Sequence, residues 1–188
     1  MARTFEKTIF QSFEEVTDPS NVAPRIAALR EKLAEKNLDA FLIPRTDAHR
    51  GESLPDAEQR LAYVTGFTGS AGLAIVGKEK AALFVDGRYT LQAPEQTNTD
   101  LVEIRQLPEA RLSDWIKKNL SKGARVGFDP WLHTPDEIRD LTKKLGGHAR
   151  LVPGDNLVDM IWVDRPLPPK GKVELLGTNR AGVPAKDK

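Results

Sequence analysis

A short polar stretch, "IPRTDAHRGE", carries side chains that could do chemistry, and it directly follows an apolar run. Asp47 and His49 stand two residues apart, so in an extended segment a carboxylate and an imidazole would lie on one side and offer two metal ligands. Two ligands do not make a metal site, and an ordinary polar turn is the competing interpretation. Because loops often carry function, Asp47, His49, Arg50 and Glu52 are candidates for a functional or interface role.

A second candidate is Arg88 in the motif "VDGRY". Its guanidinium could hold a carboxylate through two parallel hydrogen bonds. The competing and favoured interpretation is structural, with Asp86 capping a short helix that begins at Tyr89. Arg88 is kept as a further candidate beside that interpretation.

Glycines crowd the motif "GFTGSAG". A phosphate-binding loop would continue with Lys and Ser or Thr and then a helix, but the next segment, "LAIV", is strand-like. Ser70 lacks the full Gly-x-Ser-x-Gly frame of a nucleophile elbow, because Thr68 stands where the first glycine belongs. The motif predicts close backbone packing rather than catalysis.

Length and composition indicate one soluble globular domain of ordinary size. The chain has 188 residues, of which 39% are hydrophobic and 29% are charged. Its 28 basic and 27 acidic residues nearly cancel, so neither nucleic acid nor a membrane surface is an expected partner. Absence of cysteine excludes disulfides and thiolate chemistry. No stretch is apolar enough for a membrane span, and we expect a cytoplasmic protein.

The elements that must position these residues follow from periodicity and capping. Strand patterns cover 39–44, 61–67, 72–76, 81–87, 100–107, 124–130 and 149–153, and helix patterns cover 21–38, 88–96, 112–120, 134–147 and 156–162. We expect residues 77–80 to turn an antiparallel pair, and Ser113 to cap its helix. The best-marked helix begins with Thr134, Pro135 and Glu137, which together predict a capping box.

This order of elements predicts an α/β fold in which helices cover a mixed β-sheet. The first 20 residues lack a sustained period and are expected to form a flexible leader. The predicted α/β domain covers 21–163. Residues 164–188, which begin with the proline-rich "DRPLPP", are predicted to be a linker and the start of a truncated second domain.

Six separated motifs, in order, closely resemble the N-terminal domain of the Xaa-Pro aminopeptidase (aminopeptidase P) family, the creatinase/prolidase-type domain of pita-bread metallopeptidases. The motifs are "IPRTDAHRGE", "QRLAYVTGFTGSAG", "VDGRYTLQA", "RVGFDP", "NLVDMIWVDRP" and "LGTNRAGVPAKDK". The likeness covers residues 20 to 188 and is greatest to the three-domain form of the enzyme. It implies a ribonuclease-H-like fold.

The resemblance also implies a function that belongs to a longer parent protein. Such a parent hydrolyses the bond between an N-terminal residue and a following proline. Two divalent metal ions, usually manganese, are held by its C-terminal domain, which has no counterpart here. The resemblance implies no catalytic residue and no metal ligand in this chain, and it makes Asp47, His49, Arg50, Glu52 and Arg88 the candidates to face the cleft or an interface. We expect an inactive domain that shapes cleft access, contacts the parent's C-terminal domains and allows a homo-oligomer. The alternative is a stand-alone module of the same fold that binds a peptide or small molecule.

Overall fold

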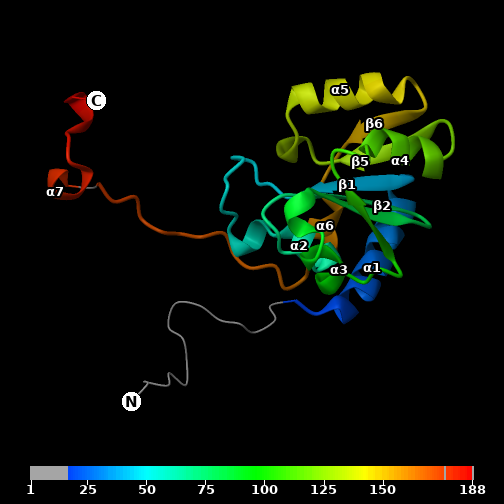
Figure 1. Ribbon diagram of the computed structural model, residues 1–188, viewed down its shortest axis with the longest axis horizontal. Helices are drawn as coiled ribbons and strands as arrows, with labels where there is room; N and C mark the ends of the chain where they lie inside the picture. Colours follow the sequence, from blue (N-terminus) through cyan, green and yellow to red (C-terminus); the bar gives the residue numbers. More distant parts are fainter. Residues whose placement is uncertain (1–16, 176, 188) are drawn as a thin grey trace, which may run out of the picture.

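Six strands form one mixed sheet in the computed structural model, which describes residues 17–175 and 177–187. Their spatial order is β4-β3-β2-β1-β5-β6 (Figure 1). The strands are β1 (Ala40–Pro44), β2 (Leu73–Gly77), β3 (Ala81–Val85), β4 (Val102–Gln106), β5 (Ala124–Phe128) and β6 (Ala149–Pro153). The predicted mixed α/β sheet is confirmed.

Strand direction places most strand ends together. β2 runs antiparallel to both neighbours, β1 and β3, whereas the pairs β1–β5, β5–β6 and β3–β4 are parallel. Five strands therefore share one direction, and their C-terminal ends lie along one side of the sheet, here called the carboxyl edge. The predicted turn over 77–80 joins β2 to β3, and the Gly77 amide donates to the Lys80 carbonyl at 2.8 Å.

Helices cover both faces of the sheet (Figure 1). One face carries α1 (Val22–Glu35), α2 (Arg60–Thr65), α3 (Gln92–Gln96) and α6 (Leu157–Ile161). The other carries α4 (Leu112–Asn119) and α5 (Pro135–Leu145). Short 3₁₀ helices occupy Pro19–Asn21, Asp56–Glu58, Gly87–Tyr89, Pro130–Leu132 and Ala185–Asp187, and α7 spans Thr178–Ala181.

Two hydrophobic layers hold the helices on the sheet. Along β1, Phe41 and Ile43 enter one layer while Ala40 and Leu42 enter the other, as the two-residue period of a strand requires. The apolar stripe predicted for the first helix is buried as expected, with Ile26, Leu29 and Leu33 all against the sheet. Because both faces are covered, the central strands are apolar on both sides.

The strand predicted over 61–67 is wrong, because residues 60–65 form α2. Leu61, Val64 and Thr65 fall at helical spacing and are buried towards α1 and the sheet. Gly66 then ends the helix in the left-handed region, with φ of +80°. A Cβ there would lie 2.3 Å from the Gln96 carbonyl oxygen, so the helix end is packed too closely for any side chain.

Ser113 does not cap α4, which corrects a second expectation. The helix begins one residue earlier, at Leu112, and Arg111 holds the N-cap position without a side-chain cap hydrogen bond. Ser113 lies instead in the first turn and is buried. Packing of the apolar face of α4 against the sheet, rather than a local cap, decides where Ser113 lies.

The capping box of α5 is confirmed. The Thr134 hydroxyl accepts the Glu137 amide at 3.2 Å, and the Glu137 carboxylate accepts the Thr134 amide at 2.8 Å. Gly146, at φ of +59°, closes the other end. Local chemistry alone therefore defines this helix.

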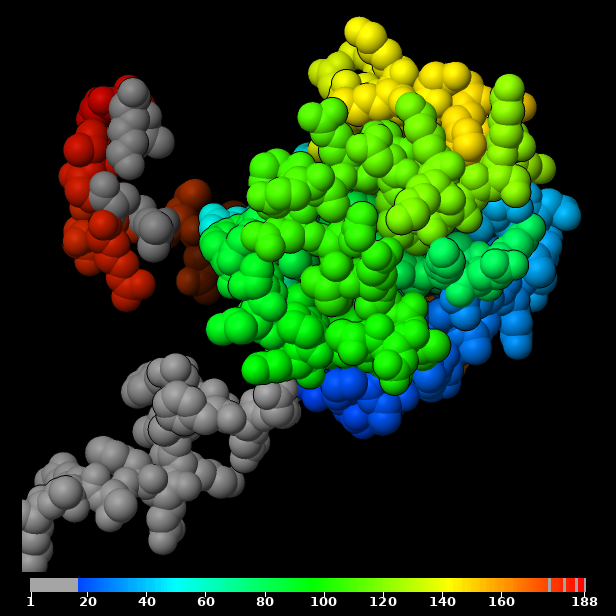
Figure 2. Space-filling model, turned by 45° about the vertical axis from the view of Figure 1, so that its right-hand side comes forward, coloured from blue at the N-terminus to red at the C-terminus, as the bar shows by residue number. Residues whose placement is uncertain are grey.

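The segment after α6 remains attached to the domain at its beginning. Arg165 donates to the Ala57 carbonyl at 2.7 Å and pairs with Glu58 and Asp159 at 2.9 Å and 2.8 Å. Further along, residues 177–187, red in Figure 2, lie apart from the body. Most of the predicted leader falls outside the described residues, and its last part, Pro19–Asn21, is a 3₁₀ turn that leads into α1.

Candidate functional site

The loops that carry the sequence motifs meet at the carboxyl edge. Residues 45–59 follow β1, 86–91 follow β3, 107–111 follow β4 and 129–134 follow β5. The glycine motif enters β2 from the same side, because Leu73 is opposite Pro44 of β1 and Phe84 of β3. Gly69 is packed against the Phe67 ring, which a Cβ would meet at 2.1 Å, so the predicted close-packing role of this motif is confirmed.

Asp47 shapes its own loop. The residue is buried, and its Oδ1 accepts the backbone amides of His49 at 3.0 Å and of Gly51 at 2.9 Å. The hydrogen bond from Gly51 is the main reason that the pKa of Asp47 lies below its ordinary value, against the opposing effect of burial. The carboxylate is thus used to fold the turn that presents Arg50.

His49 and Glu52 are exposed on this loop. The carbonyl of Glu52 accepts a hydrogen bond from Arg45 Nη1 at 2.8 Å. Within residues 17–175 and 177–187, no group of three His, Asp or Glu side chains could hold a metal ion. The Asp47–His49 pair therefore remains two separate side chains with different surroundings.

Arg50 extends from the loop to the first turn of α5. Its Nη2 donates to Glu137 Oε1 at 2.7 Å and its Nη1 to Oε2 at 3.2 Å. Burial would raise the pKa of Glu137, but the hydrogen bonds from the Thr134 amide and Arg50 outweigh it and lower that pKa overall. One carboxylate therefore caps a helix and fastens a loop.

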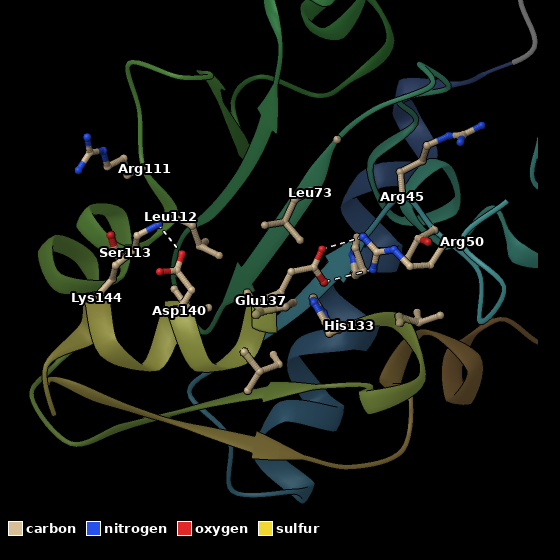
Figure 3. Close-up of a pocket in the computed structure, with 17 residues that line it drawn as sticks. Arg45, Arg50, Leu73, Arg111, Leu112, Ser113, His133, Glu137, Asp140 and Lys144 are labelled. Carbon is tan, nitrogen blue, oxygen red and sulfur yellow. Dashed lines mark hydrogen bonds and ion pairs between the residues drawn. The ribbon is translucent and has the colours of Figure 1, made fainter. Parts of the chain in front are cut away.

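His133 lies beside this ion pair (Figure 3). Its ring packs edge-on against Phe128, with 5.6 Å between the ring centres, and its Nε2 is buried without a hydrogen-bond partner. Burial lowers the pKa of His133, although Glu137 and Asp129 oppose that effect. The imidazole is therefore neutral near pH 7 and retains an unused polar atom.

A pocket of about 400 Å³ opens where the end of β1 and the start of β2 meet α4 and α5 (Figure 3). The Arg50–Glu137 pair lies at one end of it. At the other end, Lys144 pairs with Asp140 at 2.6 Å. The pocket wall also includes Arg45, Arg111, His133 and a set of leucines.

Arg88 lies on a different loop of the same edge. Its guanidinium donates two hydrogen bonds to the Asp86 carboxylate, from Nη2 to Oδ2 at 2.7 Å and from Nε to Oδ1 at 3.0 Å. The same guanidinium lies 5.1 Å from the centre of the Tyr89 ring. Asp86 also accepts the Arg88 amide and so caps the 3₁₀ helix Gly87–Tyr89, as the structural interpretation predicted. The Tyr89 hydroxyl in turn accepts the Ser70 amide at 3.0 Å.

The structure therefore divides the five predicted site residues. Asp47, His49, Arg50 and Glu52 share one loop, of which Arg50 reaches the pocket, while Arg88 belongs to the neighbouring loop. Sequence reasoning missed the pocket residues Glu137, His133, Arg111 and Lys144. Their place in the sequence could have indicated them. The segment "FDPWLHTPDE" leads out of a strand, as "TDAHR" does, so both are expected at the same edge of the sheet.

Comparison with known proteins supplies independent information. The Creatinase/Prolidase N-terminal domain model matches residues 25–161. Aminopeptidase P2 of Arabidopsis thaliana is 39% identical over 172 residues, a match that covers 86% of this chain and 24% of the relative. Xaa-Pro aminopeptidase 2 of Sus scrofa is 36% identical over 165 residues, with 86% and 24% covered. The chain thus spans about a quarter of the length of these relatives.

Solved structures agree with the fold. The X-prolyl aminopeptidase of Caenorhabditis elegans, described as a cytosolic enzyme with a di-nuclear active site, matches with a TM-score of 0.77 and 32% identity. That match covers 86% of this chain and 29% of the enzyme. The N-terminal domain of the cytoplasmic peptidase PepQ of Mycobacterium tuberculosis H37Rv matches with a TM-score of 0.59 and 27% identity, covering 73% of this chain and 98% of that domain.

Proposed function

Because this chain belongs to the creatinase/prolidase N-terminal domain family, we propose that it is the noncatalytic domain of a proline-specific metallo-aminopeptidase. In that role the carboxyl edge shapes access to the catalytic cleft and contacts another domain or subunit. The parent hydrolyses peptides that have proline at the second position, acts in the cytoplasm, and uses two divalent metal ions, which we propose to be manganese. The relatives' names and the di-nuclear centre of the nematode enzyme support this proposal.

One observation about the edge carries the proposal for contacts. The two most exposed large apolar side chains of residues 22–161 are Leu91 and Trp131, at 78% and 77%. Leu91 follows β3 and Trp131 follows β5, so both belong to loops of the carboxyl edge. Aromatic side chains are enriched in protein interfaces relative to the rest of the surface. This edge is therefore the part of the domain best suited to meet the catalytic part of the parent.

The hydrogen bonds of two candidate side chains at the carboxyl edge support a structural role for them. Asp47 and Arg88 are engaged within their own loops, Asp47 with the Gly51 amide and Arg88 with the Asp86 carboxylate. No helix in the described residues is long and apolar enough to cross a bilayer. We propose that hydrolysis depends on the catalytic domain of the parent, since this chain spans only about a quarter of the length of its relatives.

The experiment uses the parent encoded by the complete reading frame. Trp131→Ala and Arg88→Gln are compared with Glu79→Gln, an exposed change at the β2–β3 turn on the opposite edge. We expect the edge variants to change kcat/KM for a long Xaa-Pro peptide relative to a short one, and Glu79→Gln to leave that ratio unchanged. Equal ratios in all three variants and the unmodified enzyme would exclude a role of this edge in cleft access.

A further inference from the structure

The chain leaves the domain through a segment that an ion cluster fastens to two distant elements. The cluster consists of Glu58, Arg60, Asp159 and Arg165, and is here called the exit cluster. Arg60 begins α2 and donates to both carboxylate oxygens of Asp159 in α6, at 2.6 and 3.0 Å. Arg165 lies 2.8 Å from that same carboxylate and donates to Glu58 at 2.9 Å. Two guanidinium groups therefore share two carboxylates, and the charges of the cluster cancel.

Burial distinguishes the exit cluster from an ordinary surface ion pair. The side chain of Arg60 is 7% exposed, and those of the other three members are between 23% and 32% exposed. Arg165 also donates from Nε to the Ala57 carbonyl at 2.7 Å, so its guanidinium uses all three nitrogens at once. A lysine ammonium has no such planar fork. Arg165 is therefore the residue that fixes the segment after α6.

Aromatic stacking holds the same segment just before the exit cluster. Trp162 follows α6 and stacks on Tyr63 of α2, with 4.5 Å between the ring centres and 16° between the ring planes. The Tyr63 hydroxyl donates to the Ile161 carbonyl at 3.2 Å, and the Arg25 guanidinium of α1 lies 4.1 Å from the centre of the Tyr63 ring. The chain between α6 and Arg165 is therefore held by α1 and α2 as well as by the exit cluster.

This exit from the domain lies at the carboxyl edge. Ala57 and Glu58, which Arg165 contacts, belong to the loop that follows β1, and Figure 1 shows the orange segment after α6 leaving the body beside that cyan loop. Beyond Arg165 the sequence continues as "PLPPK", whose prolines favour a stiff, extended backbone of about 3.1 Å per residue. The polypeptide that follows therefore begins beside the edge that carries Leu91 and Trp131.

We propose that the exit cluster anchors the chain so that the next domain of the parent is held against the carboxyl edge, with Arg165 as the positioning residue. This inference rests on the proposed function, in which the catalytic part of the parent meets this edge, and it names the contact that keeps that part in place. Two surfaces joined by a linker meet at an effective concentration that falls as the free part of the linker lengthens. By fastening the chain as far as Arg165, the cluster shortens the free linker and favours contact between the edge and the next domain.

Hydrogen exchange of the 188-residue chain tests the anchor itself. The Trp162 and Val163 amides donate to carbonyls of α6, at 3.0 and 3.2 Å, and so report whether the segment is ordered. Arg165→Met should speed exchange at both amides about tenfold, because hydrogen bonds to charged groups are lost. Arg165→Lys keeps the charge but loses the fork and should speed exchange as well.

A matched control and the fold are followed in the same experiment. Lys170→Met, the same charge change five residues later, should leave exchange at Trp162 and Val163 unchanged. The amides of β1 and β5 should stay protected in all three variants, which shows that the domain remains folded. Equal exchange at Trp162 and Val163 in the unmodified chain and in both Arg165 variants would overturn the anchor.

Exchange of the edge loops in the complete parent tests the consequence of the anchor. Residues 88–91 and 130–132 should exchange more slowly in the parent than in the 188-residue chain. Arg165→Met in the parent should restore the faster exchange, while Lys170→Met should not. Protection that Arg165→Met leaves unchanged, or that both variants reduce equally, would overturn this inference and leave the proposed function standing. No protection in the unmodified parent would overturn both proposals, because the edge would then be uncovered.

Discussion

Arg50 and Glu137 stand 87 residues apart in sequence, yet the guanidinium of one makes two hydrogen bonds to the carboxylate of the other, at 2.7 and 3.2 Å. The pair joins the loop after β1 to the first turn of α5. Glu137 also caps that helix through the Thr134 amide, so the loop and the helix start share one side chain. The wall of the pocket is thereby assembled from two distant parts of the chain.

The energy of this pair should be modest. The two side chains are 48% and 44% exposed, and solvent screens an ion pair at such a surface. In a double-mutant cycle with Arg50→Gln and Glu137→Gln, we expect a coupling free energy of about 0.5 kcal/mol, measured by urea unfolding. A coupling above about 2 kcal/mol would mean that the loop and the helix depend on each other far more than the geometry indicates.

Arg60 should matter much more for stability. It is 6% exposed and pairs with both Glu58 and Asp159. Arg60→Met keeps an unbranched stem but removes the guanidinium and leaves Arg165 as the sole cation shared by the two carboxylates, so we expect a loss of about 3 kcal/mol in the free energy of unfolding. Arg139→Met removes an exposed pair with Asp136 and should change stability by less than about 0.5 kcal/mol. Similar losses for both variants would contradict this difference.

Gly66 and Gly146 offer a matched comparison of two helix ends. Both glycines adopt positive φ, but a Cβ on Gly66 would meet the Gln96 carbonyl oxygen at 2.3 Å, while a Cβ on Gly146 meets nothing within 4 Å. Gly146→Ala should therefore cost only the left-handed conformation, about 1 kcal/mol, and Gly66→Ala more than about 2 kcal/mol. Thermal and urea unfolding would measure both losses of stability. Equal losses would show that the backbone at Gln96 moves away from the added methyl group without an energetic penalty.

His133 should make stability depend on pH in a defined window. Burial places its folded-state pKa below the ordinary value of 6.5, so below that pH the unfolded chain binds a proton that the folded chain does not. Stability from this group is full above about pH 6.5 and is lost as the pH falls towards the folded-state pKa. Carboxylates such as Asp47 and Glu137 stabilise the fold throughout this range and lose that stabilisation only at lower pH, since their pKa values are lowered from already acidic values.

The measurement is the unfolding free energy between about pH 7 and about pH 5 for the unmodified chain and His133→Phe. We expect the variant to show the flatter profile in this range. A direct NMR titration of the imidazole would report a pKa for His133 below 6.5. An imidazole that titrates above that value, or identical pH profiles for both proteins, would show that this side chain is not desolvated.

Elements with complete local chemistry were predictable from the sequence. The helix that begins at Thr134 has its cap, its proline, its reciprocal glutamate and its terminal glycine within one segment, so no distant contact is needed to define it. The helix of residues 60–65 has no such local cap, and "LAYV" is compatible with a strand by composition. Packing against α1 and the turn at Gly66 make this segment a helix, and the conformational preferences of single residues carry no information about either contact.

The candidate site was likewise predictable from the sequence only in part. The sequence placed polar loops after strands, and the parallel strand directions brought those loops to one edge. It did not reveal that Arg50 meets Glu137 or that His133 lies beside them, because these contacts depend on the order β1-β5 in the sheet. Composition alone also could not show that the Asp47 carboxylate accepts hydrogen bonds from backbone amides of its own loop rather than facing a ligand.

Turnover by the purified 188-residue chain tests the noncatalytic assignment most directly. The folded chain would be incubated with manganese and an Xaa-Pro peptide, and release of the N-terminal amino acid would be followed beside a metal-only blank. We expect no release above the blank, while the protein encoded by the complete reading frame cleaves the same peptide. Release by the isolated chain that is abolished by a metal chelator would contradict the assignment, because it would place the catalytic centre within these 188 residues.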